Sequence, residues 1–164
     1  MSELWDIYDR DRRKTGQLVE RGNRLPDGGY HIAVQVWIQN SRGEWLISRR
    51  SPGKSNPLKW EPTGGSVIAG EDSFDAALRE VREELGITLD RRRGRLWSTS
   101  RCDNWENPGF LDVWLFEHDC PIEAIVLQEG ETCGAMWADA DQLRQLIASG
   151  EFARFSHKIP PFTD

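Results

Sequence analysis

The segment from Gly65 to Ile87 reads GSVIAGEDSFDAALREVREELGI and is the most strongly patterned part of the chain. It begins as a glycine-containing loop, and its apolar residues then recur at helical spacing; these are Phe74, Ala77, Leu78, Val81 and Leu85. Asp72 or Ser73 can cap the start of the helix, and Gly86 lies where a left-handed residue would end it. We therefore expect a helix whose apolar face packs onto a sheet.

The same helix carries three glutamates on a neighbouring arc of its surface. Glu80 is three residues before Glu83 and four before Glu84, and each pair of like charges costs about a few tenths of a kcal/mol. Glu83 and Glu84 also fall in the last turn, where the helix dipole disfavours acids. Arg79 can pair with Glu83 and offsets only part of this repulsion. A solvated face of Glu and Arg is the alternative, but a donor set of oxygens alone favours a bound Mg²⁺ or Mn²⁺ ion.

Two adjacent glycines, Gly64 and Gly65, come just before the helix, where the backbone must turn tightly or approach another group closely. From Gly65 onward the residues follow the spacing G-x5-E-x7-R-E-U-x-E-E-x-G-U, in which U is aliphatic. This pattern resembles the Nudix box. The resemblance implies an α/β fold, a Nudix-type α/β/α sandwich with a mixed β-sheet in a single domain. The box helix would cover one face, and a helix starting after Asp139 would cover the other.

The resemblance also implies a reaction and a set of roles. Nudix hydrolases cleave a diphosphate linkage, usually in a nucleoside diphosphate joined to another moiety, by attack of water on phosphorus. The metal ligands would be Gly64, Glu80, Glu83 and Glu84, and the catalytic residues would be Glu83, Glu80 and Glu131. Arg79 would orient the acids, and Glu71 would brace the loop. As acids of the site, Glu83 and Glu84 are expected to be exposed.

A later loop, from Gln128 to Cys133, resembles the loop that completes the site in many family members with a further glutamate. Glu131 is our first choice for that glutamate, and Glu129 is the second. The alternative is that both are solvated loop acids.

Cations and one tryptophan are candidates for binding the substrate. Arg49, Arg50 and Lys54 follow an expected strand and lie shortly before the glycines, where they could bind the second phosphate. As isolated charges they could equally be surface residues. Trp105 lies in a polar loop and could stack on a nucleobase, whereas most of the other tryptophans are expected in the core.

The rest of the chain is read as strands with one further helix. We expect strands at residues 31–38, 44–49, 96–100, 110–117 and 135–138. A helix over residues 139–149 would have Asp139 as its N-cap and stop at Gly150. The whole chain, residues 1–164, is expected to form one domain on which a hairpin extension, residues 1–29, packs.

Composition narrows the class of partner. A net charge of −6 argues against nucleic acid or an anionic membrane as a partner. The three cysteines are far apart, and no targeting or membrane-spanning segment is evident. We expect a cytoplasmic enzyme that acts on a small-molecule diphosphate. A homodimer stays open, because dimers are common in the family.

Two rival functions remain. The N-terminal half, with Tyr8-Asp9, Thr15-Gly16 and His31, also resembles isopentenyl-diphosphate isomerase. That enzyme uses a catalytic cysteine after the second strand and histidine ligands, whereas this chain has no cysteine from Ser51 to Gly65 and few histidines. His31 is therefore read as a strand-end residue. A non-catalytic, nucleotide-sensing Nudix module is the other rival, but such modules commonly lose the box acids, which are all present here.

Overall fold

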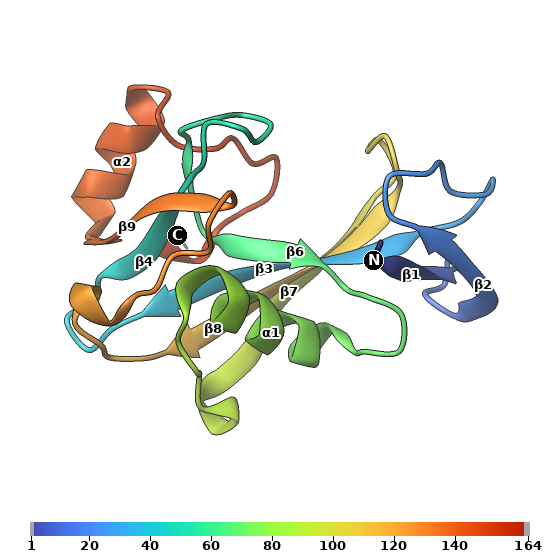
Figure 1. The fold of residues 1–164 in the computed structure, drawn as a ribbon, viewed down its shortest axis with the longest axis horizontal. Coiled ribbons are helices and arrows are strands. Elements are labelled where there is room, and N and C mark those ends of the chain that lie inside the picture. The colour runs from blue at the N-terminus through green and yellow to red at the C-terminus, as the bar shows by residue number, and fades with distance from the viewer. Residues whose placement is uncertain (1, 163–164) are drawn as a thin grey trace.

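The computed structural model describes residues 2–162, which form two sheets and two α-helices (Figure 1). The strands are β1 (Leu4–Tyr8), β2 (Lys14–Glu20), β3 (His31–Gln39), β4 (Trp45–Arg50), β5 (Trp60–Glu61), β6 (Thr63–Ser66), β7 (Gly94–Cys102), β8 (Gly109–Glu117) and β9 (Thr132–Ala138). The helices are α1 (Ser73–Leu85) and α2 (Ala140–Ala148), and short 3₁₀ turns lie at Arg91–Arg93, Ile122–Ala124 and Pro160–Phe162.

The main sheet has seven strands and is mixed, as predicted. β3 and β8 run parallel, and the other pairs are antiparallel. β3 and β4 form the predicted hairpin, but only Gln39 and Trp45 pair across it. Beyond the turn, β3 pairs with β6 and β8, while β4 pairs with β5 and β9. The two strands therefore diverge, as Figure 1 shows, and open the sheet near its centre.

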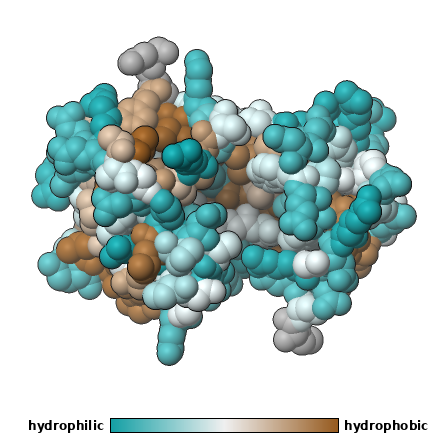
Figure 2. Space-filling view, turned by 90° about the horizontal axis from the view of Figure 1, so that it is seen from above, coloured by the Kyte–Doolittle hydropathy of each residue, from teal (hydrophilic) through white to brown (hydrophobic). Residues whose placement is uncertain are grey.

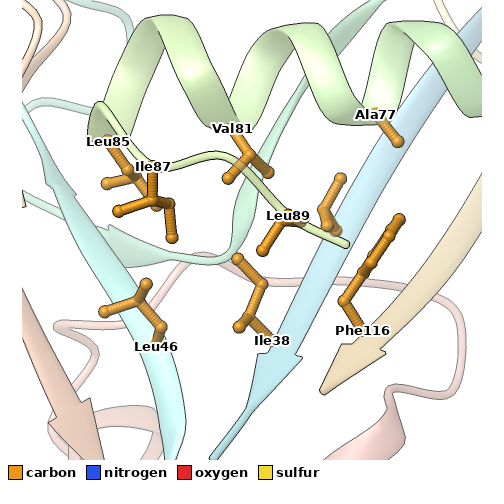
Figure 3. Close-up of a cluster of buried hydrophobic side chains, with 9 residues drawn as sticks. Ile38, Leu46, Ala77, Val81, Leu85, Ile87, Leu89 and Phe116 are labelled. Atoms are coloured by element: carbon orange, nitrogen blue, oxygen red, sulfur yellow. The ribbon is translucent and has the colours of Figure 1, made fainter. Parts of the chain in front are cut away.

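Helix α1 covers one face of the sheet through the apolar residues expected from its periodicity. Figure 3 shows Ala77, Val81 and Leu85 pointing from the helix towards Ile38 of β3 and the neighbouring strands. Asp72 caps the helix by accepting a hydrogen bond from the Asp75 amide, and Gly86 ends it in the left-handed conformation at φ 70°. Burying this apolar face anchors the helix, so its next face, which carries the glutamates, is held in a fixed direction.

The opposite face of the sheet has a second core, formed by Trp37, Ile47 and Val113 with Leu143 of α2 and Phe152 behind it. Asp139 and Gln142 close a capping box at the start of α2, and Gly150 follows its end. The chain is thus an α/β/α sandwich with a mixed sheet, as expected. Because α2 is short, the segment after Phe152 completes the cover of this face.

The predicted N-terminal hairpin is present as a separate two-stranded sheet, β1–β2. Tyr8 and Tyr30 exchange two backbone hydrogen bonds, which join the hairpin to the strand that follows. The Leu4 carbonyl accepts from the Ala69 amide at 2.7 Å, and the Asp6 carboxylate accepts from the Gly70 amide at 2.9 Å. The hairpin therefore holds the loop that leads into α1. Figure 2 shows mostly hydrophilic side chains at the right-hand end of the molecule, a mixture of hydrophilic and hydrophobic ones at the other end, and a hollow between the two.

One prediction was wrong in the segment before α1. The segment at residues 60–65, which ends in the two glycines, was read as a loop. It instead contributes to β5 and β6, and β6 pairs with β3. The glycines serve close approach here: a Cβ on Gly64 would strike the Val34 carbonyl oxygen, and one on Gly65 would strike the Glu80 carboxylate. In residues 2–162, neither helix has the length and apolar character needed to cross a membrane.

Candidate active site

A polar cleft of about 610 Å³ opens where β3 and β4 diverge. Its lining includes an excess of carboxylates over cations: Glu3, Glu61, Glu80, Glu83, Glu84 and Glu131 against Arg21, Arg50 and Lys54. The backbone of Gly64 and Gly65 forms another part of the wall. The cleft thus collects residues from the hairpin, β4, β6, α1 and the loop before β9.

Arg79 links the acids of α1 to the loop before it. Its guanidinium donates to Glu71 at 2.7 Å, to Glu80 at 2.9 Å and to Glu83 at 3.1 Å. It also donates to the Ser66 carbonyl at 3.0 Å, while Glu71 accepts from the Ile68 amide at 2.9 Å. Since the side chains of Arg79 and Glu71 are largely buried, the loop and the helix are held together by charge-assisted hydrogen bonds.

Glu80 is the most buried acid of the cleft, with 9% of its surface exposed. Its carboxylate lies against the Cα of Gly65, in the space where any other residue would place a Cβ. Burial raises the pKa of Glu80 to about 7, although the Arg79 charge acts in the opposite direction. A charged Glu80 is therefore costly unless more positive charge reaches it.

Glu84 lies deeper than expected, whereas Glu83 is exposed as predicted. Thr63 and Thr132 line the cleft with Glu84, and the Thr132 hydroxyl donates to the Glu84 carbonyl at 3.3 Å, so this residue is half-buried. Burial, followed by the charge of Glu80, raises the pKa of Glu84 to about 8. The expectation that Glu84 is fully exposed was wrong, because the loop before β9 packs over the end of α1, with the Gln128 amide donating to the Glu84 carbonyl.

The donor chemistry of the cleft fits a hard divalent cation. All of its candidate donors are oxygens, from carboxylates and the Gly64 carbonyl. Within residues 2–162, no three His, Cys, Asp or Glu side chains are grouped tightly enough to enclose an ion. One oxygen each of Glu80 and Glu83 is bound to Arg79 instead. The raised pKa values of Glu80 and Glu84 also indicate that a nearby cation would stabilise their charged forms.

The structure brings Glu131, Arg50 and Lys54 into the same cleft. Glu131 forms an ion pair with Lys54, and Arg50 pairs with Glu61 at 2.8 Å. Glu129 is exposed and does not belong to the lining. Of the two glutamates considered in this loop, Glu131 therefore has the better position.

Two candidate substrate-binding residues lie elsewhere. The Arg49 guanidinium lies 5.8 Å from the ring centroid of Trp60 and donates to the Leu58 carbonyl, on the opposite side of β4 from Arg50. Trp105 lines a separate cavity, which shares Gln35, Leu111 and Phe155 with the cleft. Neither Arg49 nor Trp105 reaches the acids of α1.

Sequence reasoning missed three charged residues of the cleft. Glu3 and Arg21 form an ion pair at 2.8 Å at the end of the hairpin nearest the box loop. Glu61 pairs with Arg50, although its segment was read only as a glycine loop. Neither the hairpin pair nor the position of Glu61 has a local sequence signal, because both depend on contacts between distant segments.

Comparison with known proteins identifies the family and the fold. The NUDIX domain profile matches residues 29–158. An uncharacterized Nudix hydrolase of Listeria monocytogenes is 35% identical over 92% of this chain and 88% of its own length. The crystal structure of DR0079 from Deinococcus radiodurans superposes with a TM-score of 0.74 at 27% identity, covering 93% of both chains. An isopentenyl-diphosphate Delta-isomerase of Shigella flexneri is 27% identical over 82% of this chain and 76% of its own.

The profile, the relatives and the superposed fold all point to one family. This chain belongs to the Nudix hydrolase family.

Proposed function

We propose that the protein hydrolyses a diphosphate linkage in a nucleoside diphosphate derivative, with Mg²⁺ or Mn²⁺ as its cofactor. The main support is the cleft itself, in which the box acids and the cations Arg50 and Lys54 line one space. An anionic diphosphate can approach so many carboxylates only if cations stand between them.

Glu80, Glu84 and the Gly64 carbonyl would hold the ion, with Glu83 as a further ligand or a group that orients water. A bound divalent ion neutralises charge on the diphosphate oxygens and lowers the pKa of an attacking water. The protein supplies the arrangement: Arg79 fixes one oxygen of Glu80 and one of Glu83 and leaves the second oxygen of each free of that contact.

The reaction needs a base beside the attacking water. The water oxygen forms a bond to phosphorus, the bond from phosphorus to the bridging oxygen breaks, and a carboxylate accepts the proton of the water. Glu83 and Glu131 are our candidates for this base. Glu131 is half-buried in the loop that packs over the end of α1 and is held by Lys54, whereas Glu83 is the exposed acid of the helix.

The cations of the cleft would bind the second phosphate. Arg50 and Lys54 each pair with a carboxylate in the structure, and so does Arg21. Exchanging a carboxylate for a phosphate keeps the charge-assisted hydrogen bonds and costs little desolvation. We therefore add Arg21 to this role and assign none to Arg49.

The test is a product screen on the full chain, with and without Mg²⁺. Substrates would be nucleotide sugars, dinucleoside polyphosphates, nucleoside triphosphates and isopentenyl diphosphate. We expect metal-dependent hydrolysis of at least one nucleotide, and at least a hundredfold lower kcat in the E83Q and E84Q variants. E117Q, which alters an exposed glutamate at the end of β8, is the matched control. Formation of dimethylallyl diphosphate without hydrolysis would support an isomerase instead, and binding without turnover would support a sensor.

Metal binding can be measured apart from turnover. We expect Mg²⁺ to raise the melting temperature above that in EDTA, because an ion bound only by the folded state stabilises it. The E80Q/E84Q double variant should lose most of this difference while it keeps the fold. An equal response of both proteins would remove these residues from the metal site.

A further inference from the structure

A second cavity, of about 680 Å³, lies beside the acidic cleft on the face of the sheet opposite α1. Aromatic side chains form much of its wall: Trp97 of β7, Trp105 of the following loop, and Phe155 and His157 of the C-terminal segment. We call this space the aromatic cavity. Both tryptophans are only half-buried, so their rings are partly open to it.

The aromatic cavity and the acidic cleft meet at three residues, Gln35, Leu111 and Phe155, which line both. A ligand with its diphosphate in the cleft could therefore extend past Gln35 into the aromatic cavity. The covalent partner of that diphosphate would then lie among aromatic rings, while the phosphates remain beside the carboxylates and cations.

Gln35 is a polar side chain with only 6% of its surface exposed. Its Oε1 accepts from Trp37 Nε1 at 2.8 Å and lies 3.1 Å from His157 Nε2. An indole N–H can only donate, so Trp37 fixes which end of the amide is oxygen. Among residues 2–162 the Gln35 amide nitrogen has no hydrogen-bond acceptor. It is also not one of the side-chain atoms that are fully buried without a partner, so it remains accessible. A fixed donor thus remains free at the junction.

We propose that the aromatic cavity binds the nucleobase of the substrate and that Gln35 donates a hydrogen bond to an oxygen of the bound nucleotide. The inference rests on the proposed function, since it takes the diphosphate to lie in the cleft. A nucleobase fits because its flat faces stack on tryptophan. Its polar edges can also meet Ser98, Ser100 and Asn104, which belong to the same wall. A purely aliphatic group would leave these polar groups and the Gln35 amide without partners.

Binding of analogues that cannot be hydrolysed tests the proposal. Calorimetry in Mg²⁺ would compare methylenediphosphonate with the 5′-(α,β-methylene)diphosphates of adenosine, guanosine, cytidine and uridine. We expect at least one nucleoside to bind roughly tenfold or more tightly than methylenediphosphonate. Equal affinity for all five ligands would overturn the inference.

Two variants, W97A and Q35E, test where the nucleoside binds. W97A should reduce the advantage of the nucleoside analogue over methylenediphosphonate to about twofold or less, while L96A should keep it. Leu96 is exposed and next to Trp97 on β7, but does not line the cavity. Q35E keeps an oxygen for Trp37 and His157 and removes the amide donor, so the same ratio should fall roughly tenfold. An unchanged ratio in both W97A and Q35E would exclude the aromatic cavity.

The ratio of the affinity for the nucleoside analogue to that for methylenediphosphonate also distinguishes a failure of this inference from a failure of the proposed function. A nucleoside advantage that depends on Trp97, in a protein that hydrolyses no natural diphosphate, would support the cavity and contradict the enzyme. Hydrolysis of nucleotides with no loss of the nucleoside advantage in either W97A or Q35E would support the enzyme and contradict the cavity.

Discussion

The guanidinium of Arg12, in the turn of the N-terminal hairpin, donates two hydrogen bonds to the carboxylate of Asp112 in β8, at 2.7 and 2.5 Å. The Asp112 side chain is 2% exposed, and that of Arg12 is 32% exposed. Burial acts to raise the pKa of Asp112, but the hydrogen bonds from Arg12 and its other partners outweigh burial and lower it. A single residue of the hairpin thus compensates a charge buried within the sheet.

We expect the R12A variant to lose about 3 kcal/mol in free energy of unfolding, because it leaves a buried carboxylate without its partner. This is the low end of the range for buried pairs, since Arg12 is partly solvated. R10A, which removes an exposed arginine from the same turn, should change stability by less than about 0.5 kcal/mol. Urea denaturation at pH 7 measures both, and equal midpoints would contradict a structural role for the pair.

Gly65 gives a second prediction. A Cβ at this position would overlap the Glu80 carboxylate, so G65A should displace Glu80 and lower kcat at least tenfold with only a small loss of stability. G134A is the control, because a Cβ there meets its nearest neighbours at an ordinary 3.5 Å. Activity assays with melting temperatures distinguish the two. A fully active G65A enzyme would show that the position of Glu80 is not critical.

Arg21 provides a third prediction. Its side chain is 52% exposed and paired with Glu3 at the cleft, so it can move onto a phosphate. We expect R21A to raise the KM of the nucleotide substrate roughly threefold to tenfold and to change kcat little, as for a lost binding contact. R13A removes an exposed arginine of the same hairpin outside the cleft and should leave KM unchanged. Equal KM values in the two variants would remove Arg21 from the substrate site.

His31 predicts a dependence of stability on pH. It is buried and stacked on Trp5, with ring centroids 4.3 Å apart, and burial lowers its pKa below the ordinary value of 6.5. Protonation therefore favours the unfolded state. The stability that neutral His31 contributes is complete above pH 6.5 and is lost as pH falls through its lower, folded-state pKa.

The H31F variant keeps an aromatic ring on Trp5 and cannot titrate. Between pH 7.5 and about pH 5, its melting temperature should fall less than that of the wild type. H118Q alters a half-buried histidine and should flatten the profile less than H31F does. Parallel profiles for wild type and H31F would show that His31 does not govern this loss.

The helix α1 could be predicted because its information is local. The Asp72 cap, the apolar spacing and the left-handed Gly86 all lie within one segment, and the same spacing places Glu80, Glu83 and Glu84 together. β6 could not be predicted, because a glycine-rich segment has low strand propensity and pairs with β3 only through distant contacts. The depth of Glu84 depends in the same way on a later loop that covers the end of the helix.

The aromatic cavity shows the same limit. Trp105 could be singled out by its polar surroundings, but its neighbours Trp97 and Phe155 come from segments far apart in the chain. The role of Gln35 depends on two partners, one of which, His157, is more than a hundred residues away. Single-sequence patterns carry no signal for such contacts.

The contacts of the hairpin show that the folded unit extends beyond the residues that the NUDIX profile matches. The NUDIX profile begins at residue 29, yet Leu4 and Asp6 hold the box loop, and Arg12 compensates Asp112. We expect a recombinant fragment cut at that point to lose stability and one wall of the cleft together. The profile thus covers only part of the folded unit, and the hairpin before it is also needed to keep this chain folded.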